Sequence, residues 1–540
     1  MKADYCLKSR ALFTGESEEP VEGCVLVRGD RILDVVPIGM EDEYIDENTQ
    51  VLDYGNKLVM PGFIDAHTHF FSGAVAASEH VCTEIADSTS EEECARMIYE
   101  FSKAHPGEKR IRGRGWFITN WGDAPLPTKA SLDALLPDIP VYLQAADAHS
   151  YWLNSAALEE CGIRGDMQVS SGYIGKLGNG ELSGMLVEME ACEPADRMYQ
   201  SFTADEMEKI YLNFFKKAAK AGVTSMSEML PGEYDEEQFE KYRVIRELEK
   251  QGRLSLRLHF YTKLYDTADF SEALRWKKCL DTDFMKISGV KGFVDGVAET
   301  YTGLLLEPYT DRKETCGINV PVKPQDELNV SVIAANKAGL PVRIHCIADG
   351  SVRMALDAFE KSAEVNGRWT VNTIEHIENI HPDDIGRFKE LGVIPSMQPI
   401  HMILDADGKI HRIGAERIKY EWPLKTLLDS CGELALGTDY PVVDLNPLDN
   451  IYAAVTRNFF DGRPATHNGW EKLSVGETLR AYTSGAARAY SRENEIGLLK
   501  KGMFADIIAL DRNLFHIPDK DILDTRVEMT MVGGKILLSE

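Results

Sequence analysis

The stretch Pro61-Gly62-Phe63-Ile64-Asp65-Ala66-His67-Thr68-His69 carries the strongest indication of a fold and of a chemistry in this chain. An apolar run from Leu58 to Ile64 predicts a buried strand that ends in the two histidines. Because alternate side chains of a strand leave on one face, His67 and His69 present their imidazoles to the same side. An isolated His-x-His pair is common and usually has no function. Here the strand, the preceding Pro-Gly and the adjacent Asp65 favour two histidines that bind one metal ion.

Composition and charge narrow the class of protein. The 540 residues are 44% hydrophobic and 27% charged, which is typical of a globular enzyme. A formal net charge of −28 argues against binding to nucleic acid, whose phosphates need a cationic surface. No apolar run approaches the ~20 residues that span a bilayer, residues 1–14 predict no signal peptide, and the ten cysteines form no CxxC pair. We predict a cytoplasmic enzyme with a small-molecule substrate and no nucleic-acid or membrane partner.

The middle of the chain alternates strand-like apolar runs with helix-like segments, which predicts repeated βα units and a parallel sheet. The helix-like segments include 206–221, 331–338 and 383–391. Eight strands are expected, enough to close a (β/α)8 TIM barrel, which is an α/β fold. Their ranges are Leu58–Ile64, Val223–Ser227, Leu254–Tyr261, Phe284–Phe293, Pro341–Ile347, Val371–Ile377, Val393–Met397 and Leu434–Thr438.

The two ends of the chain and one long connection predict additions to this barrel. Short β-like runs near both termini predict a small β-sandwich domain built from residues 1–57 and 490–540, with the barrel spanning 58–489. Roughly 150 residues separate the first two predicted strands, far more than the roughly 10–12 that a βα crossover requires. We therefore expect an insertion over about residues 72–200 with elements of its own. Because loops after barrel strands build the active-site face, this insertion should cover the active site.

Three more candidate ligands stand where apolar strand-like runs end, namely His345, His376 and Asp439. Any one of them could be a buried structural or capping residue. In a parallel barrel, however, the carboxyl ends of the strands converge on the face where catalytic groups gather. Four imidazoles and one carboxylate in one place suit zinc or a similar divalent ion.

Over nearly its full length the chain resembles the amidohydrolase superfamily, and within it the long YtcJ-like or exoenzyme-regulatory-like metal-dependent hydrolases of amidohydrolase family 3. The resemblance implies a TIM barrel with a terminal β-sandwich, in agreement with the pattern of strands. The segments that carry it are Pro61–His69, Asp147-Ala148-His149 followed by Asn154-Ser155-Ala156-Ala157-Leu158, Ala221-Gly222-Val223-Thr224, Val290–Gly296, His345, Glu375-His376, Gln398-Pro399-Ile400-His401 and Thr438-Asp439-Tyr440-Pro441-Val442.

The resemblance implies roles for the residues at the strand ends. His67 and His69 would bind one metal ion, and His345 and His376 a second. Lys291 falls where many relatives carry N6-carboxylysine, whose carbamate bridges the two ions, whereas a protonated lysine would be repelled by them. A salt-bridged or solvent-directed lysine, with a single ion bound, is the alternative. The predicted cofactor is one or two divalent ions, with zinc expected.

The resemblance also implies a mechanism. Asp439 would contact a metal ion, take the proton of the attacking water and return it to the leaving nitrogen, while the metal polarises the scissile carbonyl. Asp65 points to the opposite face of the strand, so an orienting role is favoured over ligation. We predict a metal-dependent amidohydrolase that acts on carbon–nitrogen bonds other than peptide bonds, cleaving the amide of a small N-acyl or N-formyl compound through a metal-activated water.

Alternatives to this function remain open. The same chemistry could serve a cyclic amide hydrolase or a deaminase. A rival from another class is a non-catalytic member of the superfamily with a binding or assembly role, which the presence of every expected ligand disfavours. The resemblance is also compatible with a homodimer.

Substrate contacts are less clearly marked in the sequence. His149 and His401 are the best candidates, with a structural hydrogen bond as the alternative for each. Trp116 could line a pocket or pack in a core, and Arg417 could pair with an anionic group or with an exposed carboxylate. Tyr301 stands where relatives often have the arginine of a Ser-Arg-Thr element, which puts the substrate preference, rather than metal binding, in doubt.

Overall fold

The computed structural model describes residues 1–122, 124–146, 150–169, 172–230, 236–264, 268–367, 370–404, 406 and 408–539. The chain divides into two compact units. The larger unit comprises Met1–Phe70 and Phe215–Glu540, and the smaller unit comprises Phe71–Phe214. Among the described residues, no helix is long and apolar enough to cross a membrane.

The larger unit contains a curled sheet of eight strands in which every neighbouring pair is parallel. Each strand overlaps one of the eight predicted ranges, so the predicted α/β fold with a parallel sheet is confirmed at this level. The strands follow one another in chain order: β6 (Phe63–Ile64), β13 (Val223–Glu228), β14 (Arg257–Lys263), β15 (Met285–Phe293), β16 (Val342–Cys346), β17 (Thr373–His376), β18 (Ile394–Met397) and β19 (Ala435–Leu436).

Helices connect these strands in the segments where apolar residues recur at the spacing of a helix instead of that of a strand. The three helices expected from the sequence are present as α6 (Ala204–Lys220), α9 (Gln325–Lys337) and α11 (Pro382–Leu391). The ends of α11 follow directly from its sequence. The side chain of His381 accepts the backbone N–H of Asp383 at the start, and Gly392 ends the helix with φ +66°, a conformation that glycine adopts at little cost.

The predicted strand Leu58–Ile64 is two strands in the structure, so this part of the prediction is wrong. β5 (Leu58–Pro61) pairs with strands from the chain ends, whereas β6 pairs with β13 in the parallel sheet. Gly62 lies between them, where a Cβ atom would stand 2.2 Å from the Cγ2 atom of Thr224. Both strands are fully buried, so the sequence shows one unbroken apolar run across the point where the chain passes from one sheet to the other.

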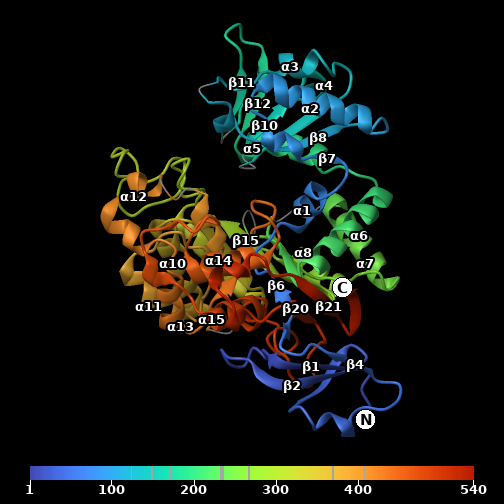
Figure 1. Cartoon of the computed structure of the whole chain (residues 1–540). Coiled ribbons are helices and arrows are strands. Elements are labelled where there is room, and N and C mark those ends of the chain that lie inside the picture. Colours follow the sequence, from blue (N-terminus) through green and yellow to red (C-terminus); the bar gives the residue numbers. More distant parts are fainter. Residues whose placement is uncertain are drawn as a thin grey trace. The chain divides into compact units, whose positions relative to one another are not determined.

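Strands from both ends of the chain share a second eight-stranded sheet, visible in Figure 1 as blue and dark red arrows. Its hydrophobic core includes Leu7, Val25, Val59 and Met531. The predicted limits of this domain, 1–57 and 490–540, stay predictions. Its strands are β1 (Tyr5–Leu12), β2 (Val21–Arg28), β3 (Arg31–Val36), β4 (Gln50–Asp53), β5, β20 (Ile507–Leu510), β21 (Val527–Val532) and β22 (Lys535–Ser539).

The smaller unit has a six-stranded sheet and several helices, among them α2 (Glu91–Ala104), so the long connection does carry elements of its own. Trp116 lies in the hydrophobic core of this unit, stacked on Trp121 with 5.5 Å between ring centroids. That the unit covers the active site stays a prediction. The strands are β7 (Val81–Cys82), β8 (Ile111–Trp116), β9 (Val141–Ala145), β10 (Ser150–Leu153), β11 (Tyr173–Lys176) and β12 (Leu182–Val187).

Candidate metal centre

His67, His376 and Asp439 form a buried cluster in which one ligand atom from each residue lies within 4.8 Å of the others. Within the described residues, it is the one group of histidine, cysteine and carboxylate side chains that is close enough to hold a metal ion. All three stand at or just beyond the carboxyl ends of parallel strands, namely β6, β17 and β19. The convergence expected from the strand ends is therefore present for these three residues.

Backbone hydrogen bonds place the first and last of these residues side by side. The N–H of Asp439 donates to the carbonyl of His67 over 2.7 Å. The Asp65 carboxylate accepts the Thr438 hydroxyl over 2.6 Å and the Thr438 N–H over 2.9 Å. Asp65 thus ties the segment after β6 to the segment after β19, which matches the orienting role predicted for it rather than a ligand role.

Two of the three cluster residues hold an unusual backbone conformation. His376 has φ +77° and Asp439 has φ +62°, in the region that side chains other than glycine rarely adopt. Such conformations persist only where the surrounding structure enforces them, and they concentrate at functional sites. Here each one turns a side chain at the end of its strand toward the same point.

His69 and His345 lie beside the cluster, but they are not part of the group whose ligand atoms all lie within 4.8 Å of one another. The Nε2 atom of His69 is 2.9 Å from the Oδ1 atom of Asp439. The ring of His345 is 4.4 Å from the ring of His376, centroid to centroid, while its Nε2 atom lies 3.1 Å from the carbonyl oxygen of Gly296. The structure therefore brings all four predicted histidines to one place, and the ligand atoms of two of them, His67 and His376, converge with that of Asp439.

Lys291 lies on β15, and its ammonium group is buried at the same end of the sheet. Its Nζ atom has no hydrogen-bond partner among the described residues, and the residue is 1% exposed. Burial lowers the pKa of Lys291 to about 8, although Glu375 and Asp439 act in the opposite direction. Burial without a hydrogen-bond partner thus weakens the preference of this side chain for its charged form.

A chain of buried charges behind the cluster was not foreseen from the sequence. The Nδ1 atom of His67 is 2.6 Å from the Oε2 atom of Glu375, whose Oε1 atom is 3.6 Å from the Nη1 atom of Arg343. Burial tends to raise the pKa of Glu375, but Arg343 and His67 hold it at about 2. An ionised carboxylate only accepts hydrogen bonds, so His67 donates from Nδ1 and keeps the Nε2 lone pair free toward Asp439.

Asp439 is ionised in this setting. Burial works against its charge, but His67 and His69 outweigh that effect and hold the pKa of Asp439 well below its usual range. Its Oδ1 atom is 3.5 Å from the Nε2 atom of His67, and its Oδ2 atom is 4.0 Å from the Nε2 atom of His401. An acceptor-only carboxylate among imidazoles is suited to ligate a cation or to take a proton.

Of the residues predicted to contact the substrate, the structure places only some near the metal-ligand cluster. His401 lies beside Asp439, whereas Trp116 is packed among other tryptophans in the smaller unit. The hydroxyl of Tyr301 donates to Asp311, and the guanidinium of Arg417 donates to the carbonyls of Glu307, Pro308 and Ile413. Those backbone contacts account for Arg417 without an anionic ligand. His149 lies outside the described residues.

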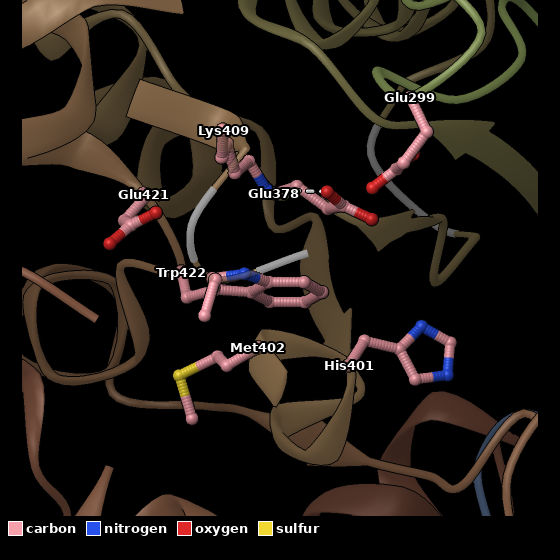
Figure 2. A pocket seen from close by; sticks show the side chains of 8 residues that line it. Glu299, Glu378, His401, Met402, Lys409, Glu421 and Trp422 are labelled. Carbon is pink, nitrogen blue, oxygen red and sulfur yellow. Dashed lines mark hydrogen bonds and ion pairs between the residues drawn. The ribbon is translucent and has the colours of Figure 1, made fainter. Parts of the chain in front are cut away.

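A pocket next to His401 adds residues that the sequence did not mark. Glu378, Lys409 and Trp422 line it together with His401, as Figure 2 shows. They come from the segment after β17, from α12 (Lys409–Arg417) and from the segment after the short helix η5 (Ile418–Tyr420). Glu378 follows the His376 ligand candidate by two positions, which is the one signal in the sequence that could have drawn attention to it.

Comparison with known proteins places these residues in a recognised family. Residues 50–538 match the model of a family described as "Amidohydrolase family". The chain is 29% identical over 545 residues to Protein LONG AFTER FAR-RED 3 of Arabidopsis thaliana, covering 99% of this chain and 91% of that protein. It is 25% identical over 524 residues to an N-substituted formamide deformylase of Arthrobacter pascens, covering 94% of each.

A solved structure supports the same assignment. The crystal structure of an uncharacterized metal-dependent hydrolase from Pyrococcus furiosus matches with a TM-score of 0.74 at 26% sequence identity. The match covers 95% of this chain and 99% of that chain, so the likeness extends over both whole molecules.

Proposed function

We propose that this chain, which belongs to the amidohydrolase family, hydrolyses the carbon–nitrogen amide bond of a small N-acyl or N-formyl compound with one or two divalent metal ions. The observation that carries the proposal is the buried convergence of His67, His376 and Asp439 at the ends of parallel strands. The family and its metal-dependent structural relative support a metal-dependent hydrolase. The N-formyl part of the proposal draws on the N-substituted formamide deformylase relative alone.

The residues present fit a divalent ion. The Nδ1 atom of His376 and the Nζ atom of Lys291 are buried without hydrogen-bond partners among the described residues, and the Nε2 atom of His67 is directed at Asp439. His67, His69, His345, His376 and Asp439 would hold the metal, with zinc suited to this donor set. Lys291 as N6-carboxylysine would bridge two ions. When bound, the metal polarises the scissile carbonyl and makes water more acidic.

We further propose that the eight parallel strands close into a (β/α)8 barrel. In support, the Ala66 N–H donates to the Leu436 carbonyl over 3.1 Å, and the His69 N–H donates to the Tyr440 carbonyl over 2.8 Å. Closure of this kind explains why the first and last strands can contribute ligands to one site.

The proton carrier in this proposal is Asp439. Its ionised carboxylate takes a proton from the attacking water and delivers it to the leaving nitrogen. Glu375 and Arg343 hold the ring of His67 from behind, so the imidazole meets the site with one fixed nitrogen. Asp439 is 6% exposed, and this burial limits the access of bulk water to the transferred proton.

Turnover of N-substituted formamides and N-acyl amino acids by wild type and by Asp439→Asn tests the proposal. Removing a general acid–base group is expected to lower kcat by about 10²–10⁴-fold, while the asparagine keeps the shape of the site. Thermal melting serves as the control for folding. Hydrolysis at equal rates by the two proteins would refute the role of Asp439, and hydrolysis of no amide by metal-loaded wild type would refute the function.

A further inference from the structure

The pocket beside the candidate metal centre has an imbalance of charge. Its lining residues are Glu299, Glu378, His401, Met402, Ala406, Lys409, Glu421 and Trp422. Three carboxylates and one ammonium group therefore line the pocket, while the guanidinium groups of Arg412 and Arg457 act on Glu299 and Glu421 from outside the lining. Lys409 is 4% exposed, Glu421 3% and Glu378 7%, while Glu299 lies toward solvent. Buried charge of one sign is costly unless a partner of opposite sign compensates it.

Inside the lining, Lys409 pairs directly with one carboxylate and acts on the other two only through longer-range attraction. The ammonium of Lys409 forms an ion pair with Glu378, as the dashed line in Figure 2 marks. Glu421 accepts the backbone N–H of His467 over 3.2 Å. In the part of the chain that the structure describes, neither Glu299 nor Glu421 forms an ion pair. The negative excess is therefore open to a positively charged ligand.

His401 forms a wall shared by this pocket and the candidate metal centre. Its ring centroid is 6.2 Å from that of Trp422, in the pocket, and 6.4 Å from that of His376. The side chain is 8% exposed, and its Nε2 atom has no hydrogen-bond partner among the described residues. A ligand in the pocket would thus lie one imidazole ring away from Asp439, toward which the Nε2 atom of His401 is directed.

The geometry favours an organic cation over a metal ion. Among the described residues, the pocket carboxylates and His401 form no group whose ligand atoms come within 4.8 Å of one another. The ring of Trp422 has the Lys409 ammonium 4.9 Å from its centroid, so this ring already faces one cation. An aromatic face attracts an ammonium group, as the position of Lys409 beside Trp422 illustrates.

We propose that this pocket binds a protonated amino group of the substrate while the amide bond lies at the candidate metal centre. The inference rests on the proposed function and specifies its substrate class as N-formylated or N-acylated amines that carry a second, positively charged amino group. A carboxylate at the same position of the substrate would face Glu299 and Glu421 and be repelled. N-acyl amino acids with a free carboxylate at this position are therefore poor substrates.

Three formamides that differ only in the tail test the inference. N-formyl-1,5-diaminopentane ends in an ammonium group, N-hexylformamide in a methyl group, and N-formyl-6-aminohexanoate in a carboxylate. The expected kcat/KM is about tenfold higher for the ammonium tail than for the methyl tail, because a desolvated cation contact stabilises a complex by about that factor. The kcat/KM for the carboxylate tail should be the lowest. Glu299→Gln, which keeps the size of the side chain, should remove most of this preference through KM and leave the methyl-tailed formamide unchanged.

Glu416→Gln is the matched control variant. Glu416 lies on α12, the helix that begins with Lys409, but its side chain is 87% exposed and pairs with Lys419 outside the lining. The substitution removes the same charge and should leave the tail preference unchanged. An equal loss of the ammonium-tail preference in both variants would show a general charge effect and overturn the inference. A wild-type protein that prefers the methyl or the carboxylate tail would overturn it as well.

Binding of pentylammonium and of 1-pentanol to metal-loaded protein, measured by calorimetry, separates the cation site from catalysis. Pentylammonium is expected to bind more tightly than pentanol, and about tenfold less tightly to Glu299→Gln than to wild type. This result supports the cation site even if no formamide is hydrolysed, in which case the proposed function alone fails. The cation site is overturned if all three formamides are hydrolysed at similar rates and if pentylammonium and 1-pentanol bind equally tightly. The proposed function would still stand in that case.

Discussion

The substitution Glu375→Gln tests whether the buried charges behind His67 prepare it for a metal ion. Arg343 and His67 lower the pKa of Glu375 from 4.5 to about 2 against the opposing effect of burial. At 1.36 kcal/mol per pKa unit, this interaction contributes roughly 3 kcal/mol to the stability of the metal-free protein. Because the pKa is lower in the folded state, the contribution is complete above the unfolded pKa of about 4.5 and is lost as the pH falls toward 2.

We therefore expect metal-free Glu375→Gln to be roughly 3 kcal/mol less stable than wild type at pH 7, in urea unfolding of the two proteins. The difference should narrow as the pH falls below about 4.5. The amide oxygen of glutamine can still accept from the Nδ1 of His67, so metal affinity should fall by about tenfold. Glu375→Leu, which offers no acceptor, should approach about a hundredfold.

The graded series of metal affinities is the part of this prediction that a general loss of stability would not reproduce. Affinity is measured by competition with a chelator at pH 7, on protein that remains folded by circular dichroism. Equal metal affinity in wild type, Glu375→Gln and Glu375→Leu would refute the argument that Glu375 orients His67. A difference in stability between wild type and Glu375→Gln that stays constant from pH 7 to below pH 4 would refute the stabilising interaction of ionised Glu375 with Arg343 and His67.

Other predictions follow from single residues of the fold and the site. Gly62→Ala should cost about 1–3 kcal/mol in urea unfolding, because its Cβ atom would stand 2.2 Å from Thr224, whereas Gly107→Ala, with nothing within 4 Å, should be near neutral. Equal unfolding midpoints for the two variants would contradict the close approach at the crossing between sheets. Lys291→Ala should lower bound metal toward one ion or none, and unchanged metal content and activity would rule out a bridging lysine.

The parts of this account that were predictable from sequence are those that depend on local pattern. Each of the eight strands overlaps a strand-like run that the sequence predicts, and His67, His376 and Asp439 stand at strand ends, where the rule for parallel sheets predicts convergence. The division of Leu58–Ile64 between two sheets was not predictable, since both strands are equally buried. What distinguishes them is the pairing with segments far along the chain, with β20 for β5 and with β13 for β6.

The parts that were missed depend on contacts between distant segments. In the sequence, Arg343 is one residue of a predicted strand with no sign of a special role. Its role follows from contacts of its side chain with the Ala66 carbonyl and with Glu375, which are distant in the sequence. The acidic pocket likewise combines Glu299, Glu378 and Lys409, which no motif connects. Trp116 belongs to a tryptophan cluster whose members lie up to 36 positions apart, counted from Trp116 to Trp152.

The central claim is that His67, His376 and Asp439 form the core of a divalent metal centre. The most direct measurement is the metal content, by mass spectrometry, of protein purified after expression with added zinc and bicarbonate. We predict one or two divalent ions per chain in wild type, and a loss of at least one ion in the double variant His67→Asn/His376→Asn. Wild-type protein that binds no divalent metal under these conditions, or a double variant that retains the full content, would contradict the claim.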